Sequence, residues 1–359
     1  MDAIIDAYVA FLALIWLGLM AIAVAGMARP NTKDRQQTRS NYAPKALVMV
    51  PCKGLDISLR ENLASLMHQS YGNYDVVAIL DDISDPALQV IRSLGMKCIT
   101  SARAWKHASG KVRALATAIK KLDAYDVYVV ADSDAAFRRD WLARLVAPLS
   151  DKTVGVSTAF PYFLPMGGFW PKVKMVWGFV GNSMMESRLT RFAWGGSMAF
   201  RKELLRGRSF NEFSKSISDD IPVTRIAKRK GLSIHYVSER VVRVSSNDDF
   251  VHFVEWSTRQ TALSILGNKK VFAYGIVFYA ANAVLLVSGI ALALLVSWLF
   301  ALLLLPFLLG AIKTYRRSHS KDPALLAVYL MSNFIYIANL IAAKRMTHIV
   351  WRGSRYRLA

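Results

Sequence analysis

Two carboxylates one residue apart, Asp132 and Asp134, directly follow an apolar run and are the first candidates for chemistry in this chain. Residues 126–131 predict a buried strand of a parallel sheet, because their apolar side chains are nearly continuous. Ligands of open α/β sheets bind beyond the carboxyl ends of the strands. Oxygen ligands suit Mg²⁺ or Mn²⁺, and such an ion can stabilise a departing diphosphate. The pattern therefore predicts a metal site at Asp132 and Asp134, with an ordinary polar turn as the alternative.

Further polar candidates follow the two strands expected earlier in the chain. Residues 46–50 predict a strand that leads to Lys53, and residues 76–80 predict a strand that leads to Asp82. The carboxylate of Asp82 can accept hydrogen bonds from a uracil or a ribose, although Asp is equally common in turns and helix caps. We expect both positions to contact a nucleotide.

A lysine lies at the start of a predicted helix, where residues 109–111 read Ser-Gly-Lys. The free N–H groups of a helix N-terminus bind phosphate, and Lys111 adds a positive charge at that place. We therefore expect Lys111 to join Asp132 in binding a nucleotide sugar. The alternative is a lysine that is simply solvated.

A second pair of carboxylates, Asp219 and Asp220, precedes a predicted helix at residues 222–230. Acidic residues favour helix N-termini, so capping explains one of the two. The other exceeds what a cap needs. Because a carboxylate can take a proton from an acceptor hydroxyl group, this pair is the candidate for general-base catalysis.

Two adjacent glycines, Gly195 and Gly196, allow either a tight turn or a close approach of the backbone to a ligand. Upstream of them, residues 170–185 are rich in Trp, Met and Phe. That segment could line a groove for an apolar acceptor, and ordinary core packing is the alternative.

These residues must be held in place by regular elements. Strands and helices alternate from residue 46 to residue 131, which predicts an α/β fold with a doubly wound parallel sheet. In such a sheet the carboxyl ends of the strands meet at one edge, so the candidates above are expected to lie near one another.

Apolar stretches flank this α/β region, and 54% of the 359 residues are hydrophobic. Residues 3–27 have the length of a membrane span. No positive charge precedes them, which disfavours a cleaved signal peptide. The positive charge follows them, so the N-terminus is expected outside and residue 29 onward in the cytoplasm. Residues 271–312 predict a hairpin of two spans that turns near Ser288 and Gly289. Residues 324–343 are long enough for another span. Basic residues flank that last segment on both sides, and both flanks are expected in the cytoplasm. The segment is therefore re-entrant or interfacial, or else one basic flank faces outside. We favour a cytoplasmic C-terminus.

The net charge of +21 does not indicate nucleic acid, because the basic residues crowd the segments beside the apolar stretches, where anionic lipid attracts them. No zinc-finger, helix-turn-helix or RNA-binding signature is visible. The two cysteines, Cys52 and Cys98, resemble neither a disulfide framework nor a metal site.

Taken in order, Asp82, the Asp-Ser-Asp at 132–134, the pair at 219–220 and a Trp-containing helix before the last apolar segments resemble the membrane-bound family 2 glycosyltransferases. Among these the chain is most similar to ceramide glucosyltransferase and its prokaryotic relatives, and the similarity includes the basic tail with Trp351 and Arg352. The resemblance implies a glycosyltransferase-A fold, a sheet that is mixed and mainly parallel, with transmembrane helices at both ends.

The resemblance also implies an organisation in five parts. Residues 1–28 would form an N-terminal transmembrane helix, 29–248 a cytoplasmic glycosyltransferase domain, and 249–270 an amphipathic helix at the membrane surface. Residues 271–343 would form the C-terminal transmembrane segments and 344–359 a basic tail. The protein would be an integral, multi-pass membrane enzyme.

The implied roles are specific. Asp82 would hold the nucleotide, Asp132 and Asp134 the metal and diphosphate, and Asp220 would be the base, with Asp219 the less critical member of its pair. The family motif Gln/Arg-x-x-Arg-Trp appears here with His252 first and Glu255 in place of the arginine, followed by the matching Trp256. Arg259, one helical turn beyond Glu255, could supply the missing cation.

The expected activity is inverting transfer of a hexose from a nucleotide sugar of the UDP-glucose type to a membrane lipid such as ceramide, with Mg²⁺ or Mn²⁺. Gly195, Gly196, Trp256, Arg259, Trp351 and Arg352 are assigned to the acceptor or diphosphate region. Two alternatives are a processive polysaccharide synthase, which would need more membrane helices, and a non-catalytic membrane scaffold, which would not need paired carboxylates at strand ends.

Overall fold

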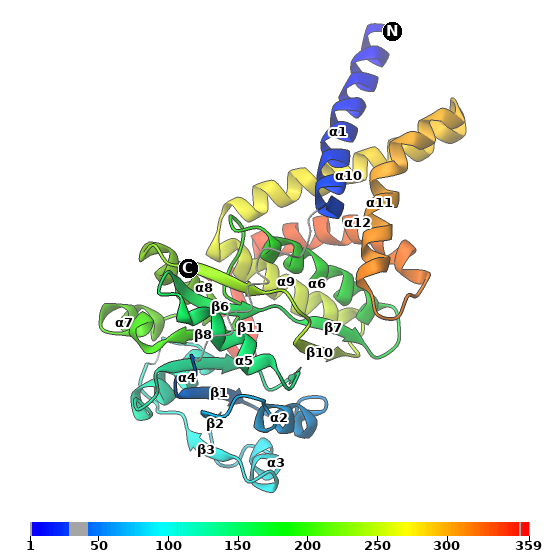
Figure 1. The fold of residues 1–359 in the computed structure, drawn as a ribbon. Coiled ribbons are helices and arrows are strands. Elements are labelled where there is room, and N and C mark those ends of the chain that lie inside the picture. Colours follow the sequence, from blue (N-terminus) through cyan, green and yellow to red (C-terminus); the bar gives the residue numbers. More distant parts are fainter. Residues whose placement is uncertain (1, 29–41, 106, 352, 359) are drawn as a thin grey trace.

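The computed structural model describes residues 2–28, 42–105, 107–351 and 353–358. Figure 1 shows an α/β body from which helices of the N-terminal and C-terminal parts of the chain project. The candidate residues lie in the body.

The body is built on a seven-stranded sheet in the order β3-β2-β1-β4-β8-β6-β9. Strand β1 pairs in parallel with its two neighbours, and β8 runs antiparallel to β4 and β6, so the sheet is mixed and mainly parallel, as expected. The strands are β1 (Ala46–Cys52), β2 (Tyr74–Leu80), β3 (Lys97–Thr100), β4 (Val127–Ala131), β6 (Val154–Ala159), β8 (Ser197–Arg201) and β9 (Ser233–Val237).

Helices cover both faces of this sheet because its strands are apolar on both sides. In β1, Val48 and Val50 pack in one apolar cluster, while Leu47 and Met49 pack in another on the opposite face. The first cluster includes α2 (Leu59–Met67), α3 (Ala87–Ser93) and α5 (Trp141–Val146), and the second includes α4 (Gly110–Lys121), α7 (Arg208–Phe213) and α8 (Asp220–Arg229).

A three-stranded sheet joins the body to the apolar helices. Its order is β5-β10-β7, with β5 (Ala135–Phe137), β7 (Tyr162–Pro165) and β10 (Val242–Ser246). Two long helices accompany it, α6 (Trp170–Glu186) and α9 (Phe250–Gly267). The ring of Trp170 in α6 stacks on Phe253 of α9 at 5.5 Å between centroids, so these helices are packed side by side.

Four helices in the described part of the chain are long and apolar enough to cross a membrane. They comprise α1 (Asp2–Ala28), α10 (Lys270–Leu295), the 3₁₀-helix η3 (Trp298–Leu304) continued by α11 (Leu305–Arg317), and α12 (Ala324–Arg345). Leu12 and Leu19 of α1 pack with Leu285, Leu286 and Phe307, which groups α1, α10 and α11 into one bundle.

The turn predicted near Ser288 and Gly289 is wrong. Helix α10 runs through both residues to Leu295, and the chain reverses at residues 296–297. A small residue at 289 serves packing instead, because a Cβ there would lie 2.9 Å from Leu304 Cδ2 of the returning segment. Glycine is common in membrane helices for this reason.

Helix α12 begins and ends at the α/β body. Before it, Lys172 at the start of α6 forms an ion pair with Asp322, and the N–H of His319 donates to the hydroxyl of Tyr162 at 3.0 Å. After it, a hairpin of β11 (His348–Trp351) and β12 (Ser354–Arg357) places the hydroxyl of Tyr356 3.1 Å from the N–H of Gly110. Both flanks of α12 are thus attached to the body.

Candidate functional site

Three residues expected at the site from distant parts of the sequence meet at the carboxyl edge of the sheet. The Lys111 Nζ lies 2.6 Å from Asp132 Oδ1 and 3.1 Å from Asp219 Oδ2. It also donates to the carbonyl of Gly195 at 3.2 Å. Asp132 follows β4, Lys111 is in the first turn of α4 and Asp219 caps α8, so three elements position the cluster.

The two carboxylates hold Lys111 in its charged form. Its side chain is only 12% exposed, which excludes the solvated alternative. Burial alone would lower the pKa of Lys111, but the negative charges of Asp132 and Asp219 outweigh it and raise that pKa far above its ordinary value. A permanent positive charge therefore lies at the centre of the site.

Gly195 and Gly196 are required by the carboxylates that lie against them. A Cβ at Gly195 would be 2.3 Å from Asp219 Oδ2, and one at Gly196 would be 2.6 Å from Asp132 Oδ2 and 2.2 Å from the Trp194 ring. No side chain fits at either place without displacing a carboxylate or the indole. The close approach predicted for these glycines is therefore an approach to Asp132 and Asp219.

The adjacent carboxylates Asp219 and Asp220 have different surroundings. Asp219 is buried, and its Oδ2 has no hydrogen-bond partner among the described residues apart from its charge contact with Lys111. Asp220 Oδ1 accepts hydrogen bonds from the Ser218 hydroxyl and, at 2.7 Å, from the N–H of Ile221. Burial, reinforced by the negative charge of Asp219, raises the pKa of Asp220 to about 6. Asp220 thus has the proton affinity of a base that works near neutral pH.

The turn that carries Asp132 and Asp134 is anchored by Asp56, which precedes α2, and by Asn62 of α2. The Ser133 hydroxyl donates to Asp56 at 2.5 Å, and the Asn62 amide donates to the Ser133 carbonyl at 3.1 Å. This leaves Asp134 exposed one residue beyond Asp132. These two hydrogen bonds fix the backbone of the turn.

The described residues contain no group of three or more His, Cys, Asp or Glu that could hold a metal on its own. Mg²⁺ and ions like it are usually bound by one or two carboxylates together with water and substrate phosphates, so a larger protein cluster is not required. Asp132 and the exposed Asp134 offer such hard oxygens. These donors fit Mg²⁺ or Mn²⁺.

The positions expected to contact the nucleotide lie along the same edge. Asp82, after β2, is exposed, and its Oδ1 accepts from the N–H of Ser84 at 2.8 Å, which lowers the pKa of Asp82 below its ordinary value. Lys53, after β1, is half-buried. Gly54 beside it donates its N–H to both oxygens of Asp85, at 3.0 and 3.1 Å. Asp82 therefore takes part in a turn, as the alternative reading expected, and its side chain is exposed; its contact with a nucleotide stays a prediction.

Trp256 packs against aromatic rings and a lysine of neighbouring elements. Its ring contacts among the described residues are with Trp177 at 4.8 Å and Phe163 at 5.2 Å between centroids. The Nζ of Lys174 lies 4.4 Å from the centre of the Trp256 ring and 2.7 Å from Asp248 Oδ2. A buried cation from α6 thus stands beside Trp256, where we had expected Arg259 to supply one.

The remaining motif residues are distributed as follows. Glu255 is exposed and Arg259 is partly buried, both on α9. Trp351 belongs to β11, and Arg352 lies outside the described residues. The assignments of Trp351 and Arg352 to the acceptor or diphosphate region stay predictions.

Sequence reasoning missed three contributors: Arg113, Lys174 and Tyr356. Arg113 pairs with Asp81 at 3.0 Å beside the first turn of α4. The place of Arg113 two residues after Lys111 was a usable signal. The contact of Tyr356 joins residues 246 positions apart in the sequence and has no local signature.

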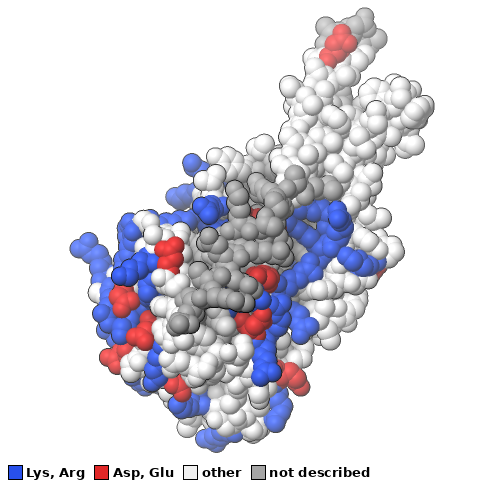
Figure 2. All heavy atoms as spheres, in the orientation of Figure 1, with Lys and Arg blue, Asp and Glu red and all other residues white. Residues whose placement is uncertain are grey.

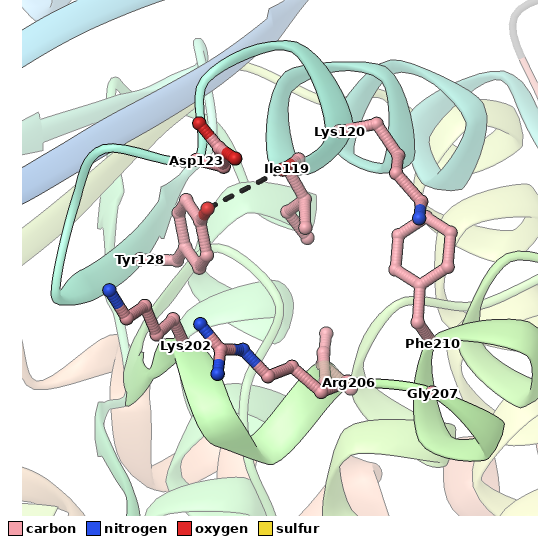
Figure 3. Close-up of a pocket in the computed structure, with 9 residues that line it drawn as sticks. Ile119, Lys120, Asp123, Tyr128, Lys202, Arg206, Gly207 and Phe210 are labelled. Carbon is pink, nitrogen blue, oxygen red and sulfur yellow. Dashed lines mark hydrogen bonds between the residues drawn. The ribbon is translucent and has the colours of Figure 1, made fainter.

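A separate cavity of about 320 Å³ lies at the other end of α4 and β4. Figure 3 shows Lys120, Lys202 and Arg206 around it, with Tyr128 and Phe210 on its apolar walls. Since Lys111 begins α4 and Lys120 lies in its last turn, this cavity is distinct from the carboxylate cluster. None of the residues proposed from the sequence lines it.

Two solved structures are similar to this chain over two thirds or more of its length. Among solved structures, mannosyltransferase PcManGT from Pyrobaculum calidifontis, in complex with GDP-Man and Mn²⁺, is similar over 96% of this chain and 97% of its own, at 18% identity and a TM-score of 0.54. Glucosyl-3-phosphoglycerate synthase from Mycobacterium tuberculosis, in complex with Mn²⁺ and UDP-Glc, is similar over 67% of this chain and 84% of its own, at 15% identity and a TM-score of 0.43. The first likeness confirms the glycosyltransferase-A fold.

The model of glycosyl transferase family 21 matches residues 9–359, which include the carboxylate cluster, α9 and the apolar helices on both sides of the body. This match confirms the resemblance seen in the order of the sequence motifs. The protein therefore belongs to glycosyl transferase family 21.

Proposed function

We propose that this glycosyltransferase transfers a hexose from a nucleoside-diphosphate sugar to the hydroxyl group of a membrane lipid, with inversion at the anomeric carbon. The observation that supports it best is the cluster of Lys111, Asp132 and Asp219 at the carboxyl edge of the sheet, on the body from which apolar helices project. The binding of GDP-Man by a mannosyltransferase of the same fold is consistent with such a donor.

The donor would bind along the edge formed by β1, β2 and β4. Lys53 and Asp82 would contact the nucleoside, and Lys111 and Asp132 would contact the diphosphate. A Mg²⁺ or Mn²⁺ ion held by Asp132 and Asp134 would neutralise the charge of the departing diphosphate. Lys111 contributes a fixed positive charge to the same end.

Asp220 is the proposed base. Its carboxylate takes the proton of the acceptor hydroxyl while the hydroxyl oxygen forms a bond to the anomeric carbon. The bond from that carbon to the diphosphate oxygen breaks, and the diphosphate leaves with the electron pair. Because one displacement completes the transfer, a nucleophilic Ser or Cys is not needed.

The acceptor would reach the site from the membrane side of the body. Helices α6 and α9 carry the rings of Trp177 and Trp256 there, together with the buried pair of Lys174 and Asp248. An apolar lipid tail would pack against the aromatic rings, and a ceramide-like acceptor has the required hydroxyl group.

The proposed topology has three crossings. Helix α1 would cross from outside to the cytoplasm, and α10 and α11 would form a hairpin whose turn at 296–297 is external. The basic end of α11, with Arg316 and Arg317, then faces the cytoplasmic body, as the positive-inside rule requires. Helix α12 would lie along the membrane surface, because both of its flanks are attached to the body.

A transfer assay tests the proposed function directly. The purified full-length protein, in nanodiscs with a lipid extract and Mn²⁺, would be given radiolabelled UDP-glucose or GDP-mannose. We expect label in the lipid phase, as a single hexose per lipid by mass spectrometry, and loss of that label in Asp134→Ala. A polymeric product would instead indicate the polysaccharide synthase. If a full panel of nucleotide sugars gives no donor hydrolysis and no transfer, the protein is a non-catalytic scaffold.

A further inference from the structure

The last described segment of the chain, the hairpin β11–β12, presents one face to the body. Ile349 and Tyr356 are paired across it and so project on the same side. Ile349 is 4% exposed and Tyr356 is partly buried, whereas Val350 on the opposite face is 63% exposed. The hairpin is therefore docked on its Ile349 face.

The docked face reaches the first turn of α4. The N–H of Gly110 donates to the Tyr356 hydroxyl at 3.1 Å, while the N–H of Val112 donates to the Ser109 hydroxyl at 3.2 Å. The next residue after Gly110 is Lys111, which bridges Asp132 and Asp219. Tyr356 thus lies at the end of α4 that carries the cationic centre of the site.

The hydrogen bond from Gly110 leaves the Tyr356 hydroxyl able to donate a second hydrogen bond. A tyrosine hydroxyl both accepts and donates, and here its oxygen accepts from Gly110. No acceptor for its own proton is found among the residues that the structure describes. The first turn of a helix attracts anions, so a phosphate oxygen near Lys111 would be a suitable acceptor for that proton.

We propose that Tyr356 binds the donor diphosphate by donating its hydroxyl proton to a phosphate oxygen, and that the hairpin β11–β12 forms one wall of the donor site. This inference rests on the proposed function, because it requires a nucleoside-diphosphate sugar as the donor. It assigns the C-terminal segment to donor binding, whereas the sequence had placed its residues only loosely in the acceptor or diphosphate region.

The test uses full-length protein in nanodiscs and calorimetry with UDP and with GDP, each with Mn²⁺. Tyr356→Phe removes the hydroxyl and keeps the ring. We expect its Kd for the nucleotide and its KM for the sugar nucleotide to rise about tenfold, with kcat changed less than twofold, because a hydrogen bond to a charged group is lost. The matched control is Tyr125→Phe, whose hydroxyl donates to Asp75 at 2.8 Å, away from the site; its Kd should not change.

Hydrogen exchange provides an independent measurement on the unmodified protein. Binding of the nucleotide with Mn²⁺ should slow amide exchange across residues 348–357, and unchanged exchange there would overturn the proposal. Equal or tighter nucleotide binding by Tyr356→Phe would overturn it as well, since a tighter variant would mean that the hydroxyl competes with the donor. If the unmodified protein binds neither UDP nor GDP, the proposed function itself fails.

Discussion

At the scale of single residues, the neighbouring carboxylates of Asp219 and Asp220 have different contacts. Asp219 forms an ion pair with Lys111, whereas Asp220 accepts hydrogen bonds from the Ser218 hydroxyl and from a backbone N–H. The raised pKa of Asp220 follows from burial and from the charge of Asp219. The proposed proton acceptor, Asp220, thus lies next in sequence to a member of the charged cluster and has different hydrogen-bond partners.

The proposed base predicts a pH profile. Asp220 must be ionised to accept a proton, so kcat/KM should rise with pH and level off above an inflection near 6, the pKa to which Asp220 is raised. Asp220→Asn should lower kcat about 10²–10⁴-fold and leave nucleotide binding nearly unchanged. Transfer rates measured from pH 5 to 8 beside calorimetry of UDP would check both.

Asp219→Asn is the control for that experiment. It keeps Asp220 but weakens the contact with Lys111, so we expect mainly a higher KM for the donor and a smaller loss of kcat. If Asp220→Asn loses nucleotide binding while Asp219→Asn loses only turnover, the two roles are reversed.

The raised pKa also affects stability, with a definite sign. Between the ordinary Asp pKa and about 6, the folded protein holds the Asp220 proton more tightly than the unfolded chain does. The contribution of this group to the free energy of unfolding is therefore full at low pH and is lost as the pH rises through about 6.

A second prediction concerns Gly196. Its α-hydrogen faces Asp132 and the Trp194 ring, so Gly196→Ala must displace one of them. We expect nucleotide binding to fall at least tenfold while the protein stays folded, because the change lies at the edge of the sheet. Gly72→Ala is a matched control, since a Cβ at Gly72 meets nothing within 4 Å. Equal binding by both variants would show that Asp132 does not contact the donor.

At the scale of the elements, α12 differs from the other apolar helices. It is the most buried of the four, and its flanks hold Asp322 against α6 and Tyr356 against α4. Its 22 residues would span about 33 Å, enough to cross a membrane, yet a crossing would part the two flanks. Length and hydropathy alone therefore do not distinguish a crossing helix from one that lies along the membrane.

The proposed topology predicts on which side of the membrane two inserted tags will lie. A protease-cleavable tag inserted between residues 296 and 297 should be protected in sealed inside-out vesicles, and the same tag after residue 359 should be cleaved. Detergent should expose both, which controls for access. Cleavage of both tags in sealed vesicles would contradict an external turn between α10 and η3.

The sequence predicted the strands and the carboxylates after them because both are local patterns. Near-continuous apolar runs identify buried strands, and the chain order brings their ends to one edge. It did not predict that Lys111 bridges Asp132 and Asp219, because an ion pair depends on tertiary distances. The error at Ser288 and Gly289 has a similar origin, since small residues that end helices in water serve close packing between apolar helices.

At the scale of the whole molecule, charge and apolar surface are separated. Figure 2 shows the projecting helices almost free of Lys and Arg, which gather on the body and where the helices join it. Seen with the exposed apolar side chains of α1 and α10, this division indicates a bilayer around the projecting part. In the same view, Lys and Arg also occur on the part of the body that lies far from the projecting helices.

A truncation tests this arrangement. A protein that lacks residues 1–28 should still sediment with membranes and resist extraction by carbonate, because α10 and α11 remain. Loss of the contacts of α1 with Leu285 and Phe307 should lower its thermal stability in detergent. Recovery of the truncated protein in the soluble fraction would contradict the proposed crossings of α10 and α11.

The contacts of α1 also bear on how the protein is made. Tyr8 pairs with Ser288 through their hydroxyls at 2.6 Å, and the indole N–H of Trp16 donates to the carbonyl of Leu302 at 2.9 Å. These partners are 280 and 286 residues apart in the chain. At roughly 5–20 residues per second, a ribosome needs on the order of 15–60 s to synthesise the partners after α1. During that time the polar groups of α1 lack their final partners, so we expect these contacts of α1 to form only after the residues of the α/β body before α10 have been synthesised.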